Sequence, residues 1–209
     1  MHIYNIVEQG KAVNKASHAL ILLHGRGATA SDILGLASEF CDDTFYIAAP
    51  QATNNRWYPY SFMAEDSTNE PWLQSAVDMV KRLIDETCTH IPKSNLYIMG
   101  FSQGACLALE VSARYADKYG GVVAFTGALI GHTLNPEKYQ GNFQGTKVFI
   151  GTDDNDPHVP LLRTKQSKEV MEKLGAHVTL KVYKGMGHTI TEDEINWVKA
   201  NIMPKTLSS

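Results

Sequence analysis

The segment that decides the fold runs from residue 96 to residue 115 and reads LYIMGFSQGACLALEVSARY. Residues 96–101 form a largely apolar run of strand length, and residues 103–115 have the length and spacing of a helix. Ser102 stands between the two, with Gly100 and Gly104 on either side. A side chain at either glycine would collide with the neighbouring strand or helix in so sharp a turn. The segment therefore predicts a strand, a strained turn with an exposed serine hydroxyl, and a helix.

Short apolar runs alternate with helical patterns on both sides of this segment. We expect further strands at residues 3–7, 19–23, 45–49, 121–125, 147–151 and 177–182, and further helices from Ser31 or Asp32 to Phe40 and at residues 71–90, 161–174 and 191–202. This rhythm predicts an α/β fold, with a mostly parallel central sheet covered by helices on both faces and no separate cap domain. Two irregular stretches, 51–70 and 127–145, follow strands and should lie on the functional rim at the strands' carboxyl ends.

Residues 100–104 match the pattern Gly-x-Ser-x-Gly in the strand–turn–helix context of a nucleophile elbow. A serine hydroxyl needs a base that is itself oriented by an acid, and in this fold the chain order is Ser, then Asp or Glu, then His. Asp153, Asp154 and Asp156 follow the strand expected at 147–151 and are alternative acids. His188 is the best base, because its glycine neighbours let a loop carry the ring inward. We therefore predict Ser102 as nucleophile and His188 as base.

Two backbone N–H groups are candidates to stabilise a developing oxyanion. Gln103 begins the helix after Ser102, and its N–H is one of the free N–H groups at the positive end of the helix dipole. Residues 24–27 read HGRG and follow the first buried strand, where such enzymes supply a second donor. We predict the N–H of Arg26 for that role, and we expect His24 to brace the turn.

An aromatic, irregular loop holds the candidate substrate-binding residues Arg56, Trp57 and Tyr58, with Trp72 beyond it. These side chains either line an acyl or leaving-group pocket or seal one end of the core. Arg26 or Arg56 could meet an anionic substrate end.

No metal or cofactor is expected. The acidic loop 153–158 lacks the glycine and the distant glutamate of a calcium loop. Three other histidines, His132, His158 and His177, are expected to be surface or packing residues.

The joint pattern of motifs resembles one family nearly from end to end. The motifs are LHGRG at 23–27, GFSQGA at 100–105, FTGAL at 125–129, DPHVP at 156–160 and GHTI at 187–190, followed by an acidic last helix with Trp197. They look like the phospholipase/carboxylesterase family of α/β-hydrolases, which includes acyl-protein thioesterases and small bacterial esterases. The resemblance selects Asp156 as the acid, because the family's aspartate precedes x-x-Val-Pro. It implies a carboxylesterase, lysophospholipase or thioesterase that hydrolyses a small-molecule ester or thioester without a cofactor.

The chain departs from the thioesterase branch of that family at two places. Arg26 and Ala28 replace a leucine and an aspartate, and residues 57–59 read WYP instead of Trp-Phe-Asp. These differences point to a carboxylesterase of the bacterial type.

Length and composition indicate the number of domains, the partners and the cellular location to expect. The 209 residues predict a single domain, 1–209, and a net charge of −3 gives no reason to expect nucleic acid or an anionic membrane as partner. No secretory signal and no apolar run of membrane-spanning length is visible, and three unpaired cysteines favour a reducing compartment, so a cytoplasmic location is expected. A homodimer is a possible assembly.

Two alternatives to ester hydrolysis stay open at this stage. The chain could be a catalytically inert binding protein with a hydrolase fold, or an acyltransferase that passes the acyl group to an alcohol or amine.

Overall fold

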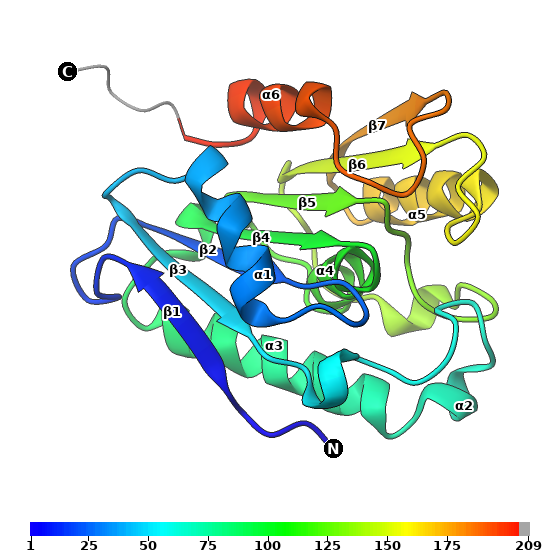
Figure 1. Ribbon diagram of the computed structural model, residues 1–209, viewed down its shortest axis with the longest axis horizontal. Helices are drawn as coiled ribbons and strands as arrows, with labels where there is room; N and C mark the ends of the chain where they lie inside the picture. Colours follow the sequence, from blue (N-terminus) through cyan, green and yellow to red (C-terminus); the bar gives the residue numbers. More distant parts are fainter. Residues whose placement is uncertain (205–209) are drawn as a thin grey trace.

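A computed structural model of the chain describes residues 1–204, so the last five residues of the expected domain lie outside the described part. Seven strands form one sheet in the order β1-β3-β2-β4-β5-β6-β7 (Figure 1). Their bounds are Ile6–Gly10 (β1), His18–Leu23 (β2), Phe45–Pro50 (β3), Leu96–Phe101 (β4), Gly121–Phe125 (β5), Lys147–Asp153 (β6) and His177–Tyr183 (β7). All neighbouring strands are parallel except β1, which pairs antiparallel with β3.

Helices cover both faces of the sheet, as the sequence predicts (Figure 1). They are Ala30–Leu34 (α1), Asp66–Asn69 (α2), Trp72–Cys88 (α3), Gln103–Arg114 (α4), Leu161–Lys173 (α5) and Glu192–Asn201 (α6), with short 3-10 turns at Gly35–Glu39, Thr53–Asn55, Lys93–Asn95 and Pro136–Lys138. Alternate residues of β2 enter opposite cores: Ile21 and Leu23 pack with α3 and α4, whereas Leu20 and Leu22 pack with α1 and α6. A strand buried on both faces has to be apolar at successive positions, which is why residues 19–23 form an unbroken apolar run.

The first strand lies three residues later than the sequence predicts. It covers Ile6–Gly10 instead of residues 3–7, and Ile3 is exposed. Its register on β3 decides its bounds, with Gly10 opposite Tyr46. Gly10 has φ +77°, and a Cβ there would lie 2.4 Å from the carbonyl oxygen of Phe45. Because an edge strand is half exposed, its apolar pattern is weak and pairing sets its ends.

The first helix begins earlier and ends sooner than predicted. Its N-cap is Thr29, not Ser31 or Asp32, and Thr29 forms a capping box with Asp32. The expected helix to Phe40 divides at Leu34, and a 3-10 turn from Gly35 to Glu39 completes it. The reciprocal Thr29–Asp32 bonds satisfy two N–H groups, so they determine the start of the helix.

The other predicted elements agree with the structure to within about two residues. The irregular stretches contain only short helical turns, including α2 in the first and Pro136–Lys138 in the second. They follow β3 and β5, and the loops after β2, β4, β6 and β7 lie at the same edge of the parallel sheet (Figure 1). This edge gathers the candidate site residues.

Candidate active site

Ser102 lies at the turn between β4 and α4, with φ 54° and ψ −118°. Such a left-handed conformation in a residue other than glycine costs about 1–3 kcal/mol and persists only where neighbours enforce it. Here the N–H of Ser102 donates to the carbonyl of Phe125 at 3.0 Å. A Cβ on Gly100 would lie 2.3 Å from the carbonyl oxygen of Gly104, and one on Gly104 would lie 2.1 Å from that of Leu23. Both glycines are therefore required by close backbone approach.

His188 links the serine to a carboxylate. Its Nε2 lies 2.7 Å from the Oγ of Ser102, and its Nδ1 lies 2.7 Å from the Oδ2 of Asp156. A neutral imidazole whose Nδ1 donates to Asp156 has Nε2 free to accept the serine proton. The three side chains come from the loops after β4, β6 and β7, so the parallel sheet brings together residues up to 86 positions apart.

The three candidate acids occupy different positions. The Oδ1 of Asp156 accepts from the N–H groups of His158 and Val159 at 2.7 and 2.9 Å, and the side chain is fully buried. Asp153 instead joins the acid loop to the histidine loop, because its carboxylate accepts from the N–H groups of Asn155 and Gly187 at 2.8 and 3.0 Å. These bonds lower the pKa of Asp153 and keep it ionised. Of the three carboxylates, Asp156 is the one that contacts His188.

The two predicted oxyanion donors flank Ser102. Gln103 is the first residue of α4, and Arg26 follows Gly25, whose position is in van der Waals range of the Ser102 side chain. Within residues 1–204 neither backbone N–H donates to another protein group. Neither N–H group is therefore already engaged by a protein acceptor.

A cavity of about 590 Å3 opens over Ser102. Its lining is mainly apolar or aromatic, with several polar groups; it comprises Gly25, Arg26, Ala28, Tyr58, Pro59, Tyr60, Ser61, Phe62, Phe101, Ser102, Gln103, Cys106, His158, Val159 and His188. A volume of this size is typical of a small-molecule site.

Of the four predicted substrate-binding residues, only Tyr58 lines this cavity. Trp57 is fully buried and donates its indole N–H to the carbonyl of His24 at 2.8 Å. Arg56 and Trp72 border a separate, small hollow. Aromatic content identified the right loop. An irregular loop has no repeating geometry, however, so its sequence does not say which side chains face the cavity.

His158, which we expected to be a surface or packing residue, is exposed and also lines the cavity. Its ring lies edge-on to the ring of His188, with centroids 4.8 Å apart. Phe62 and Val159 are further lining residues that the sequence analysis did not single out. For His158 and Val159 a signal existed: they lie within three residues of Asp156, so the short acid loop has to bring them near the base.

His24 braces its turn, as expected. Its Nδ1 lies 2.8 Å from the carbonyl of Gly25 and its Nε2 accepts from the N–H of Ala52 at 3.2 Å. Burial lowers the pKa of His24, so the ring stays neutral and can accept this bond.

Hydrogen bonds hold the wall of the cavity in place. The side chain of Asn69 accepts from the N–H of Tyr60 at 2.9 Å and donates to the carbonyl of Ser61 at 2.8 Å. The N–H of Gly131 donates to the carbonyl of Phe62 at 2.8 Å, which joins the two irregular stretches. Residues 60–62 therefore form a fixed wall.

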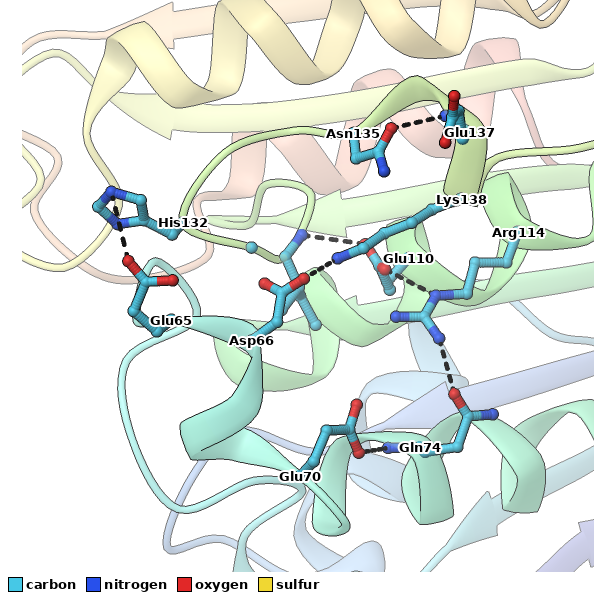
Figure 2. A network of polar contacts seen from close by, with 12 residues as sticks. Glu65, Asp66, Glu70, Gln74, Glu110, Arg114, His132, Asn135, Glu137 and Lys138 are labelled. Carbon is cyan, nitrogen blue, oxygen red and sulfur yellow. Dashed lines mark hydrogen bonds and ion pairs between the residues drawn. The ribbon is translucent and has the colours of Figure 1, made fainter.

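A polar network joins α2, α3, α4 and the second irregular stretch (Figure 2). Glu110 is fully buried in α4, where it accepts from Arg114 at 2.7 Å and from the N–H of Ile130 at 3.0 Å. Lys138 forms an ion pair with Asp66, so the second irregular stretch also contacts α2.

Among the described residues, no group of three His, Cys, Asp or Glu side chains has the geometry to hold a metal ion. The same part of the chain contains no helix with the length and apolar character needed to cross a bilayer.

The sequence model of the phospholipase/carboxylesterase family matches residues 3–204. The chain belongs to this family. Its α/β-hydrolase fold agrees: the crystal structure of a phospholipase/carboxylesterase from Dyadobacter fermentans superposes with a TM-score of 0.94 at 48% sequence identity, covering 96% of this chain and 97% of that one.

Two curated relatives are more distant. Acyl-protein thioesterase 1 of Saccharomyces cerevisiae is 33% identical over 156 residues, which are 73% of this chain and 66% of that protein. A probable carboxylesterase of Arabidopsis thaliana, SOBER1-like, is 27% identical over 68% of this chain and 56% of its own length. The chain thus spans about two thirds or less of these two relatives.

Proposed function

We propose that the chain is a serine esterase, which hydrolyses carboxylic esters or thioesters with Ser102 as nucleophile, His188 as base and Asp156 as the orienting acid. The observation that carries the proposal is the unbroken chain of two 2.7 Å hydrogen bonds from Ser102 through His188 to Asp156. Membership of a family of phospholipases and carboxylesterases supports it.

The proposed reaction has two halves. His188 takes the proton of Ser102 as the hydroxyl oxygen attacks the acyl carbon, and the N–H groups of Arg26 and Gln103 stabilise the oxyanion. Collapse of this intermediate expels the alcohol or thiol, which leaves with the proton from His188. Water then attacks the acyl-enzyme with His188 again as base, and the acid is released as Ser102 regains its proton.

The cavity suggests the class of substrate. Tyr58, Phe62, Cys106 and Val159 give it apolar walls, which suit an uncharged acyl chain of moderate size. The guanidinium of Arg26 uses two of its five N–H donors on the carbonyls of Pro59 and Tyr60, which hold it against the wall of the cavity. A small-molecule ester or thioester with an apolar acyl group is therefore the proposed substrate.

Substitution of the nucleophile tests the proposal. Ser102→Ala should abolish hydrolysis of short p-nitrophenyl esters and labelling by a fluorophosphonate probe while circular dichroism stays unchanged. Ser38→Ala removes an exposed hydroxyl outside the cavity and serves as the control, with wild-type activity expected. Hydrolysis retained by Ser102→Ala would refute the assignment, and no labelling of the wild type would favour an inert binding protein. A panel of esters and thioesters of graded acyl length, with and without a competing alcohol, then separates hydrolysis from acyl transfer.

A further inference from the structure

The two residues that supply the proposed oxyanion donors, Arg26 and Gln103, both form side-chain hydrogen bonds with one short segment. We define the clamp segment as residues 55–60. The guanidinium of Arg26 donates to the carbonyls of Pro59 and Tyr60 at 2.8 and 2.6 Å. The carboxamide of Gln103 accepts from the N–H of Trp57 at 2.9 Å and donates to the carbonyl of Tyr58 at 2.9 Å.

The clamp segment also bonds to the backbone of the loop that carries Arg26. The indole of Trp57 donates to the carbonyl of His24 at 2.8 Å, and the N–H of Gly27 donates to the carbonyl of Asn55 at 2.7 Å. The loop after β2 and the start of α4 therefore both form hydrogen bonds with the same six residues. The strands that precede them, β2 and β4, are also neighbours in the sheet.

We infer that the clamp segment positions the oxyanion hole, with the side chains of Arg26 and Gln103 as its positioning groups. The inference rests on the proposed function. The N–H groups that would bind the oxyanion belong to the backbone, so a change of either side chain leaves both donors chemically intact. Displacement of these donors would lower the rate without removing them. Misplacement of reacting groups by about 1 Å can cost about 100-fold in rate.

The geometry distinguishes this role from general support of the fold. Arg26 is an exposed residue, and it bonds to the carbonyls of Pro59, which is half-buried, and Tyr60, which is exposed, so water can replace its guanidinium. A planar fork that binds two carbonyls holds direction as well as distance, which a lysine cannot do. Loss of the guanidinium should therefore displace the backbone N–H of Arg26 more than it lowers the free energy of unfolding.

The first test is Arg26→Met, which keeps the aliphatic stem and removes the fork. We expect kcat to fall about 10- to 100-fold, while KM changes less than about threefold, because the ground state does not use the oxyanion donors. Arg26→Lys should recover part of the loss. The matched control is Arg82→Met on α3, an exposed arginine that pairs with Glu86, for which wild-type kinetics are expected.

The second test is Gln103→Glu, which has the same shape but places a second acceptor against the carbonyl of Tyr58. It should lower kcat in the same way, and its combination with Arg26→Met should be less than additive, because both act through the clamp segment. An alkyl trifluoromethyl ketone forms a charged tetrahedral adduct with a serine. Its inhibition constant should rise by the factor by which kcat/KM falls.

Hydrogen exchange separates failure of this inference from failure of the proposed function. Amides of residues 24–28 and 55–60 should exchange faster in Arg26→Met and remain unchanged in Arg82→Met. If the wild type proves inactive but exchange still rises, the link through the clamp segment holds and the esterase assignment fails. If the wild type is active and both variants keep wild-type kcat, the inference is overturned.

Discussion

At the residue scale, Asp156 is the most constrained group of the candidate site. Its two carboxylate oxygens accept from His188 and from the N–H groups of His158 and Val159, and no part of the side chain is exposed. In the proposed mechanism, this buried carboxylate fixes the imidazole tautomer and stabilises the imidazolium.

Asp156→Asn tests this role. The amide keeps the shape but lacks the charge and favours the wrong tautomer, so kcat should fall by about 10⁴. Asp154→Asn changes a partly exposed carboxylate in the same loop, and it should keep wild-type activity. Esterase kinetics with p-nitrophenyl butyrate provide the measurement. An Asp156→Asn enzyme within about tenfold of wild type would contradict the role given to this aspartate.

At the element scale, the elbow depends on how closely β4, α4 and β2 approach one another. The position of Gly104 lies against the carbonyls of Leu23 and His24, and that of Gly100 lies against the backbone of Gly104 and Ala105. Backbone atoms at these distances cannot move aside without shifting a strand or a helix.

Gly104→Ala should therefore destabilise the protein by about 1–3 kcal/mol or more through overpacking. Gly35→Ala is the matched control, because Gly35 has helical dihedral angles and a Cβ there would meet nothing within 4 Å. It should stabilise the protein by about 0.4–1 kcal/mol. Urea unfolding at neutral pH measures both, and equal midpoints for the two variants would refute the packing argument.

At the scale of the whole molecule, Glu110 connects parts of the chain that are distant in sequence. It joins α4 to the stretch after β5 through Ile130 and Tyr139, and Arg114 extends the connection to Gln74 on α3 (Figure 2). Removal of one member of a buried ion pair lowers the free energy of unfolding strongly, because the other charge stays buried without its partner.

Glu110→Ala should cost about 3–5 kcal/mol of unfolding free energy, because Arg114 loses its charge partner and the N–H of Ile130 loses its acceptor. Glu172→Ala is the control: Glu172 also forms a pair four residues apart, with Lys168, but on the surface, and its loss should cost less than about 0.5 kcal/mol. The same urea titration tests our proposal that residues 1–209 form one domain. The unfolding transitions followed by fluorescence and by far-ultraviolet circular dichroism should then coincide.

For Glu110, similar losses of unfolding free energy in the two variants would contradict its buried role.

Much of the architecture could be read from local pattern. The apolar runs at 19–23 and 96–101 predict buried parallel strands because both faces of such a strand are covered. Residues 100–104 predict the elbow because only glycine fits its close approaches. The bounds of β1 and α1 could not be read in this way, since pairing with β3 and the Thr29–Asp32 capping box decide them.

The sequence by itself determined the parallel α/β sheet, the elbow at Ser102 and the order in which a carboxylate and His188 follow Ser102, because these depend on local patterns and on the rule that parallel strands end at one edge. The choice of Asp156 among three carboxylates came from the family resemblance. Only the tertiary structure decided which side chains of the aromatic loop face the cavity, that His158 lies against His188, and that the fork of Arg26 binds carbonyls of its own chain. The physical reason is that an irregular loop has no repeating geometry. The direction of its side chains is set by hydrogen bonds to residues such as Gln103 and Asn69, which lie in other elements of the fold.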